Sequence, residues 1–384
     1  MAPSKLLNRL VSRVTVEWAG FLVHKAAPTH YYPQISPSDP IFALSVVALG
    51  VNGYMRKPKP LPSPLAQQPF TLAEALEAGL TRARTRAGDL WTPSREIRLP
   101  RATAFGLLES CRALVSVTPS SVVSHITAAK IHGLYLPLRF ENEQGFHLSK
   151  KVGTGRPQRR HVRGHELCLG PGDVVMIRGV PATSVQRTLL DIAPLLSVEE
   201  LVVVADQMVC AHHYSFGPVK IAMVELGDLN NYVARHAGMR AMRKVRAAME
   251  LVRVGSDSPP ETRLRLLISM SPLPIFECNF ELKDDNGKGR IAPDLACRRY
   301  RTCAEYDGAH HFSPDQQSKD HDRDFITKSL GWHQVLINKD DMAKGKLVVV
   351  TKIARMLVLG GWPDPQNLAC RSLRGELHTR KDFA

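Results

Sequence analysis

In the last third of the chain, the spacing of hydrophobic positions changes from helical to strand-like and back. After Pro260 and Glu261, the residues Leu264, Leu267 and Ile268 recur at the spacing of one helix face. Alternating or apolar runs predict four strands, and longer periodic runs predict two more helices. The strands are expected over residues 275–282, 289–297, 302–306 and 332–337, and the helices over 315–330 and 340–358. The predicted element order is therefore α-β-β-β-α-β-α.

The first clear pattern of the N-terminal half begins at Pro69. Thr71 and Glu74 are spaced as a capping box, in which each side chain satisfies a backbone donor at a helix start. A second short helix is expected from Thr81, followed by a β-hairpin over residues 91–99. This second helix carries three basic residues, Arg82, Arg84 and Arg86. Helix, turn, basic helix and hairpin is the order of a winged helix-turn-helix, and a small α+β lobe with solvated arginines is the alternative.

The middle of the chain mixes helical and strand-like patterns. Helices are expected over residues 107–115, 119–132, 184–208 and 231–253, the last of them strongly basic. Short strands are expected over residues 146–148, 167–169 and 174–177. The basic stretch 150–165 is interpreted as a connector, and His212 and His213 as surface histidines without partners. The pattern predicts an α+β middle region.

These patterns predict an α/β multidomain chain, in keeping with a length of 384 residues, which exceeds one ordinary core. Six segments are expected along it. They are an extension with a Pro-rich linker over 1–68, a winged helix-turn-helix over 69–100, an α+β domain over 101–230, a basic connecting helix over 231–257, a C-terminal αβββαβ domain over 258–360 and a tail over 361–384.

Charge and cysteine content narrow the choice of partner and compartment. A formal net charge of +15 favours a polyanion such as DNA or RNA, while an aromatic content of 6% argues against a single-strand binder built on many stacked rings. Seven cysteines without a CxxC pair indicate a reduced, cytoplasmic chain and do not favour a zinc site. No membrane segment and no signal peptide are expected.

Two carboxylates are spaced to meet on the hairpin formed by the second and third predicted strands of the C-terminal domain. If Arg299 and Tyr300 form the turn, Asp294 and Glu305 are directly opposed, with Cβ atoms roughly 5 Å apart. Two carboxylates at that distance repel one another unless a cation lies between them. Mg²⁺ or Mn²⁺, held by both acids and by a strand carbonyl, that of Tyr306, would relieve the repulsion.

Other polar residues would surround such a metal. Asp307 lies two residues past Glu305 and therefore points to the same face of the strand. His311 follows shortly afterwards and is a candidate to activate water or to protonate a leaving oxygen. The flanking helices carry three further candidate site residues, Lys319, Arg323 and Glu261. The first two are expected to clamp phosphate, and Glu261 to reach the metal, although acids are also favoured at helix starts by the dipole. This set suits metal-dependent phosphodiester hydrolysis.

Four sequence motifs occur together between residues 258 and 332. They are Glu261-Thr-Arg-Leu-Arg-Leu-Leu267, Pro293-Asp294-Leu-Ala296, Ala304-Glu305-Tyr-Asp307-Gly308 with His311, and Asp320-x-x-Arg323-Asp324 continuing to Trp332. This arrangement resembles the PD-(D/E)xK nuclease superfamily, in its branch similar to very-short-patch-repair endonucleases. The resemblance implies a restriction-endonuclease-like core with Asp294 and Glu305 as metal-binding acids. The superfamily's lysine position falls on Asp307, and His311 matches the histidine used in that branch.

The region from residue 70 to 208 resembles the AbiEi-like antitoxin module of type IV toxin–antitoxin systems, mainly through the pattern over 71–99. Together the two resemblances imply a DNA endonuclease targeted by an N-terminal DNA-binding module. They leave open a homodimer and a toxin–antitoxin or defence-system partner. The alternative is a non-catalytic DNA-binding antitoxin or transcription regulator with an inactivated nuclease domain. An RNA substrate also remains open.

Overall fold

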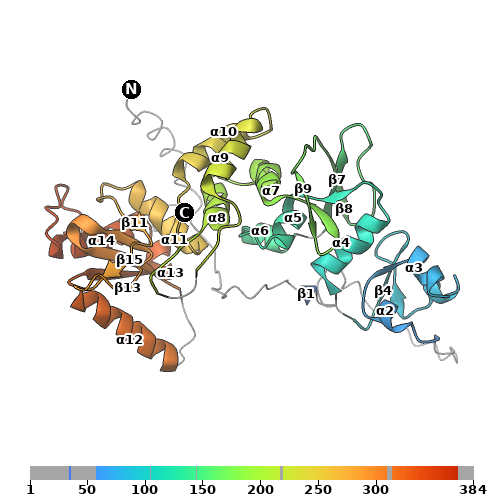
Figure 1. Cartoon of the computed structure of the whole chain (residues 1–384), viewed down its shortest axis with the longest axis horizontal. Coiled ribbons are helices and arrows are strands. Elements are labelled where there is room, and N and C mark those ends of the chain that lie inside the picture. Colours follow the sequence, from blue (N-terminus) through green and yellow to red (C-terminus); the bar gives the residue numbers. More distant parts are fainter. Residues whose placement is uncertain are drawn as a thin grey trace, which may run out of the picture. The chain divides into compact units, whose positions relative to one another are not determined.

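The computed structural model describes residues 34–35, 58–103, 105–143, 145–216, 219–308 and 314–370, with backbone alone for 34–35 and 314–320. The described chain is mixed α/β and divides into two compact units (Figure 1). Of the described residues, unit 1 contains Ala205–Met223 and those from Leu251 onward, and unit 2 contains those up to Val204 together with Val224–Glu250. The α/β multidomain class is therefore confirmed, but unit 1 also takes a segment from the middle of the chain.

Two of the expected segments lie largely outside the described residues, namely the extension over 1–68 and the tail over 361–384. From residue 58 onward, α2 (Ser63–Ala66) precedes the first sheet. Every helix within the described residues is too short to cross a bilayer.

Unit 2 begins with a small lobe built on three short strands. β2 (Phe70–Thr71), β4 (Ile97–Pro100) and β3 (Leu90–Trp91) form a sheet in that order. The helix α3 (Leu72–Glu77) begins at the predicted capping box, since the amide of Glu74 donates to Oγ1 of Thr71 at 3.1 Å and the amide of Thr71 donates to the Glu74 carboxylate at 2.6 Å. The predicted first helix and hairpin are thus both present.

The second helix expected in this lobe is reduced to a single turn. Only a 3-10 turn, η1 (Arg84–Arg86), follows α3 before the hairpin. The turn is held by Arg84, whose side chain donates to both carboxylate oxygens of Asp89, at 2.8 and 2.7 Å, and to the carbonyl of Lys59. A recognition helix needs several turns to fill a major groove, so the winged helix-turn-helix pattern is incomplete here.

The rest of unit 2 is a five-stranded mixed sheet with helices against it. Its strand order is β8-β7-β6-β10-β9, and β7 and β8 run parallel. The strands are β6 (Val122–Val123), β7 (Phe146–Lys151), β8 (Val162–Leu167), β9 (Val174–Ile177) and β10 (Val180–Thr183). The helices are α4 (Leu107–Ser116), α5 (His125–Ile131), α6 (Leu138–Glu141) and α7 (Val185–Ile192), and the short strand β5 (Phe105–Gly106) precedes them.

Three expectations for the middle region are corrected by the structure. The helix expected over 119–132 is shorter, because its first part forms β6, which pairs with both β7 and β10. The end of the stretch interpreted as a basic connector forms β8, so that Arg163 lies on a strand. The basic helix expected over 231–253 is two helices, α9 (Leu226–Arg235) and α10 (Met242–Leu251), separated by a turn in which Ala241 has a left-handed φ of 65°.

Unit 1 has the predicted order of helices and strands. After α8 (Val198–Val209), which runs into it from unit 2, come α11 (Pro259–Ser269), five strands, α12 (Pro314–Ser329), β16 (His333–Asn338), α13 (Lys339–Ala343) and α14 (Lys346–Leu359). The five strands are β11 (Glu277–Cys278), β12 (Leu282–Lys283), β13 (Gly289–Ile291), β14 (Leu295–Cys297) and β15 (Thr302–Asp307). The main sheet has the order β11-β14-β15-β16.

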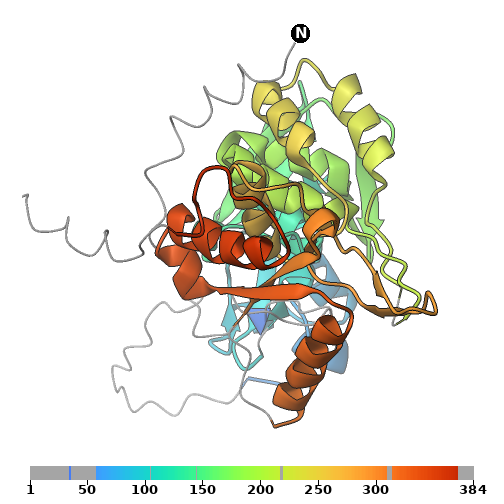
Figure 2. The ribbon, with the colours of Figure 1, turned by 90° about the vertical axis from the view of Figure 1, so that its left-hand side faces the viewer.

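The two faces of this sheet carry different side chains. One face joins α11 and α14 in a single apolar core that includes Leu264, Leu295, Ala304, Ile337 and Ile353. Since side chains alternate along a strand, Cys303, Glu305 and Asp307 project from the other face. The helix α12 lies on that second side, opposite α14 (Figures 1 and 2). The candidate acids are therefore placed between the sheet and α12 rather than in the core.

Candidate functional site

The β14–β15 hairpin has the register predicted from the sequence. Leu295 pairs with Ala304 and Cys297 with Thr302, on either side of a turn centred on Arg299 and Tyr300. Continuing this register by one step places Asp294 opposite Glu305. The two carboxylates also project from the same face, because both alternate with residues of the apolar core. The sequence thus correctly predicted which two acids the hairpin brings together.

The strand that carries Asp294 is interrupted immediately before the acid. β11 pairs with β14, and β12 with β13, and the pairs Cys278–Leu295 and Leu282–Ile291 share one register, so these strands are two halves of a single hairpin, with a register shift between Leu282 and Lys283. Pro293 lies at the interruption, where it has no amide hydrogen to donate to a ladder. Across from it, Asn279 adopts a left-handed φ of 47° and donates its amide to the carbonyl of Asp294 at 3.2 Å. The break leaves Asp294 at a strand start, half-buried.

The Asp294 carboxylate also has a structural contact. Its Oδ2 accepts a hydrogen bond from the amide of Tyr306 at 2.8 Å, across the end of the β14–β15 ladder. The carbonyl of Tyr306, the predicted third metal ligand, accepts from the amide of Gly308 at 3.2 Å. Asp294 and Tyr306 are therefore held together by the backbone, in a geometry that does not depend on a cation.

Glu305 is paired with an arginine from α12. Nη2 of Arg323 lies 3.0 Å from Oε1 of Glu305 and also donates to the carbonyl of Ala292, at 3.2 Å, which the strand break has released from the ladder. Burial alone would lower the pKa of Arg323, but the charge and hydrogen bond of Glu305 outweigh it and raise this pKa. The Glu305 side chain is 14% exposed and that of Arg323 is 38% exposed, so the ion pair is partly shielded from water. Arg323, predicted as a phosphate clamp, instead neutralises one of the two acids.

The remaining predicted site residues are distributed unevenly. Asp307 is exposed at the end of β15. His311 lies outside the described residues, and Lys319 lies on the part of α12 described by its backbone alone. Within the described residues, the acids do not form a compact group of three ligand atoms. Such a group, with its atoms within 4.8 Å of one another, is formed instead by His125, His147 and His165 of unit 2.

Glu261 has a structural position different from the predicted one. It is 4% exposed at the start of α11, on the core face of the sheet. Its carboxylate accepts from the amide of Asp257 at 2.7 Å and from the hydroxyl of Ser258 at 2.7 Å, while Ser258 caps the helix. These contacts make Glu261 part of a helix cap. The physical reason is the one that favours acids at any helix N-terminus.

Replacing Glu261 with alanine is therefore expected to affect stability. The change leaves two buried donors without their acceptor, and each unsatisfied donor costs about 1–3 kcal/mol. We expect the free energy of unfolding to fall by about 2 kcal/mol, measured by urea unfolding of the full chain followed by tryptophan fluorescence. Trp332 and Trp362 lie in unit 1 and report its transition. An unchanged unfolding midpoint would contradict the capping role.

The sequence did not reveal a polar cluster centred on Asp257. The Asp257 carboxylate forms an ion pair with Lys220, accepts from Sγ of Cys210 at 3.2 Å and lies 3.4 Å from Nε2 of His212. Burial alone would raise the pKa of Asp257, but Lys220 outweighs it and lowers this pKa. His212 is thus half-buried with a partner, contrary to the expectation of a free surface histidine, whereas His213 is exposed as expected.

Tyr214 connects this cluster electrostatically to the acid pair. Its ring stacks on His212 with centroids 4.6 Å apart. Burial raises the pKa of the Tyr214 phenol, and the charges of Asp257 and Asp294 raise it further. The segment Ala205–Met223 therefore contributes polar and aromatic groups within electrostatic range of Asp294. This proximity is a long-range contact that no local sequence pattern could indicate.

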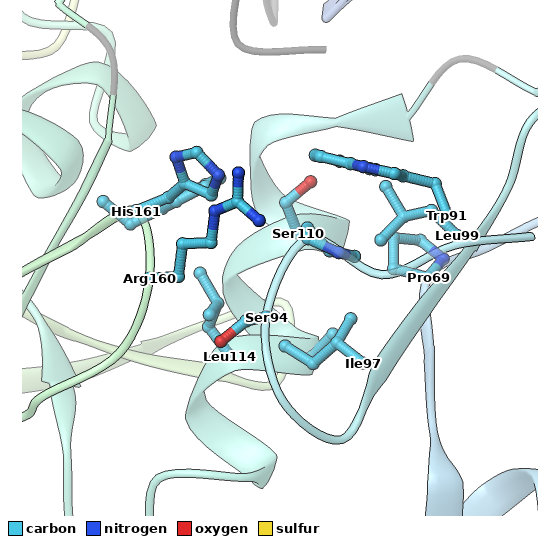
Figure 3. Close-up of a pocket in the computed structure, with 12 residues that line it drawn as sticks. Pro69, Trp91, Ser94, Ile97, Leu99, Ser110, Leu114, Arg160 and His161 are labelled. Carbon is cyan, nitrogen blue, oxygen red and sulfur yellow. The ribbon is translucent and has the colours of Figure 1, made fainter. Parts of the chain in front are cut away.

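The predicted DNA-binding arginines are only partly available. Arg82 and Arg86 are exposed, whereas Arg84 is held by Asp89. The described pocket of this region lies between the β3–β4 hairpin and α4, where Trp91 and Ser110 face the Arg160 side chain (Figure 3). Its lining is mainly apolar. The pocket thus lies at a junction between secondary-structure elements of unit 2, and none of the predicted acids lines it.

Comparison of the chain with models of known protein families, with curated proteins and with solved structures gave no match in any of the three.

Proposed function

We propose that unit 1 is a metal-dependent endonuclease of the PD-(D/E)xK type. The observation that carries this proposal is the opposition of Asp294 and Glu305 across the β14–β15 hairpin, on the sheet face turned away from the apolar core. Two carboxylates on neighbouring strands in a chain with a net charge of +15 are costly without a cation or a base beside them. The order of helices and strands in unit 1 further supports the proposal.

The donor set suits a hard divalent cation. Asp294 and Glu305 offer carboxylate oxygens, and the backbone carbonyl of Tyr306 is proposed as the third ligand, and these are the ligand types that Mg²⁺ and Mn²⁺ prefer. A bound cation would polarise the scissile phosphate and lower the pKa of a coordinated water. The hydrogen bond from Tyr306 to Asp294 fixes the position of one ligand in advance.

The protein's own residues would divide the remaining tasks. Arg323 is placed to exchange its contact with Glu305 for a contact with a phosphate oxygen once Glu305 is engaged elsewhere, because a guanidinium binds both groups in a similar geometry. His311 is proposed to hold or deliver a proton near the leaving oxygen, as the resemblance implies. Asp307 and Lys319 are proposed to position water and phosphate respectively. Glu261 is left out of this set because of its capping contacts.

DNA is the proposed substrate, and its binding would come mainly from positive charge. The exposed arginines Arg82 and Arg86 in unit 2 are proposed to contact phosphates. Because the second helix of the N-terminal lobe is a single turn, we propose contact with the DNA backbone there rather than base reading by a full recognition helix. We also propose that the region from residue 70 to 208 is an antitoxin-like module.

Plasmid cleavage by the full chain tests the catalytic proposal. Supercoiled plasmid is expected to be nicked or linearised with Mg²⁺ or Mn²⁺ and to stay intact with excess EDTA. Glu305→Gln is expected to slow cleavage by about 10- to 100-fold, a smaller loss than for an unpaired ligand because Arg323 already shares its charge. Asp285→Asn is the matched control, since Asp285 is exposed on a hairpin turn and should cleave like the wild type.

The Glu305–Arg323 ion pair also favours a second candidate, a DNA-binding regulator without nuclease activity. An arginine that neutralises Glu305 can replace the cation and leave an inactive fold. Salt-dependent DNA binding by the wild type without cleavage in any metal would support this regulator and refute the enzyme. RNA in place of DNA in the same assay distinguishes the substrate class.

A further inference from the structure

Three histidines from separate elements meet on one face of the unit 2 sheet. His147 lies on β7 and His165 on the neighbouring parallel strand β8, where it pairs in register with Ser149. His125 is the first residue of α5, which packs on β7. Ring nitrogens of all three lie within 4.8 Å of one another. None of the three was a candidate in the sequence, because 22 and 18 residues separate them along the chain (125 to 147, and 147 to 165).

The rings are closely arranged. Nδ1 of His147 lies 3.0 Å from Nε2 of His165, and the rings of His125 and His165 stack with centroids 3.8 Å apart. Two nitrogens on a tetrahedral zinc ion at the usual Zn–N distance of about 2.0–2.1 Å are about 3.4 Å apart. The ring nitrogens therefore gather in one place, but the rings are stacked with interplanar angles of 28°, 17° and 11°, so the side chains must turn before all three can direct a nitrogen at one ion. We propose that His125, His147 and His165 bind a borderline transition-metal ion, for which Zn²⁺ is the model.

The groups around the trio are those that orient metal-bound histidines. Nδ1 of His125 lies 3.0 Å from Oγ of Ser124, which leaves its Nε2 to face a metal. If His147 binds through Nδ1, its proton rests on Nε2, which lies 3.5 Å from Oε1 of Glu143. A carboxylate behind a ligating imidazole is a recurrent feature of zinc sites, because it fixes the tautomer and raises ligand basicity.

Unsatisfied atoms also point to a ligand. Among the described residues, Nε2 of His147 and Oε2 of Glu143 are buried and make no hydrogen bond, although the Glu143 side chain is 90% buried. Such orphaned polar atoms are rare in native interiors and call for an explanation. In the zinc-bound form the His147 Nε2–H is directed at Oε1 of Glu143, which also accepts from Arg163, so that Nε2 gains a partner.

The backbone is consistent with this arrangement. His125 has a left-handed φ of 50°, a conformation that non-glycine residues seldom adopt and that persists mainly where function requires it. Three imidazole ligands favour Zn²⁺ over Mg²⁺ and leave at least one position for water or a small anion.

Metal content and Co²⁺ spectroscopy test this site without any enzyme assay. The full chain is stripped with a chelator, dialysed and titrated with Zn²⁺ by calorimetry, and a parallel sample receives Co²⁺. We expect one tightly bound Zn²⁺ per chain and visible absorption bands of four-coordinate Co²⁺. His125→Asn and His165→Gln are expected to weaken Zn²⁺ binding by about 100-fold or more, and Glu143→Gln by about tenfold.

His132→Gln is the matched control, because His132 lies at the other end of α5 and its Nε2 is bonded to the carbonyl of Thr183 instead. It should retain full Zn²⁺ affinity. Glu143→Gln, which alters no ligand, keeps the test decisive if a histidine variant fails to fold. Absence of Zn²⁺ binding by the wild type, or equal binding by the wild type, His125→Asn and Glu143→Gln chains, would overturn the proposal and leave a hydrogen-bonded histidine stack.

Discussion

An Asp294→Asn chain is expected to cleave DNA about 10²- to 10³-fold more slowly than the wild type while binding DNA with nearly the same affinity. Asparagine keeps an oxygen that can accept the hydrogen bond from the amide of Tyr306, so the hairpin should retain its geometry. It loses the negative charge that a divalent cation requires. Single-turnover cleavage in Mg²⁺ and fluorescence anisotropy in the absence of metal, both at one fixed salt concentration, measure the two quantities separately.

The affinity should persist because it depends on a different set of groups. The chain has 51 Lys and Arg residues, and phosphate contacts by such residues dominate DNA affinity and its salt dependence. Loss of one carboxylate removes none of these contacts. Wild-type cleavage by Asp294→Asn would exclude Asp294 as a metal ligand, whereas equal loss of cleavage and affinity would assign it to the structure of the hairpin through its bond to Tyr306.

The acid pair could be predicted because it depends on local geometry. A hairpin turn fixes which residues face each other, so locating the turn at Arg299 and Tyr300 was enough to oppose Asp294 and Glu305. The capping box at Thr71 and Glu74 is equally local and is also confirmed. A turn or a helix cap that involves only a few neighbouring residues fixes its own local geometry without contacts from distant segments.

The features that the sequence did not indicate depend on contacts between distant segments. Arg323 is a plausible phosphate ligand by position, and its pairing with Glu305 requires α12 to lie on one particular face of the sheet. The trio of His125, His147 and His165 requires two neighbouring strands, β7 and β8, and the helix α5 to come together.

Asp206→Ala is expected to destabilise unit 1 by about 3–5 kcal/mol, since removing one partner of a buried ion pair leaves the other charge uncompensated. Asp206 is fully buried on α8, and its carboxylate accepts from Arg265 at 2.6 Å, from the hydroxyl of Thr262 at 3.0 Å and from the amide of Arg253 at 2.9 Å. Urea unfolding monitored by the tryptophans of unit 1 should show the midpoint at a markedly lower concentration.

A double substitution separates the ion pair from the packing around it. Arg265 is 7% exposed, and within the described residues its Nε makes no hydrogen bond, so alanine at position 206 would strand a buried guanidinium. Replacing both residues with apolar ones, as in Asp206→Leu with Arg265→Met, removes both charges at once and should recover much of the loss. Additive effects of the two changes would mean that the pair contributes no coupling, and that α8 is held against α11 by its apolar contacts alone. Strong coupling would instead identify this buried pair as the link that fixes Ala205–Met223, and with it Tyr214, beside the acid pair.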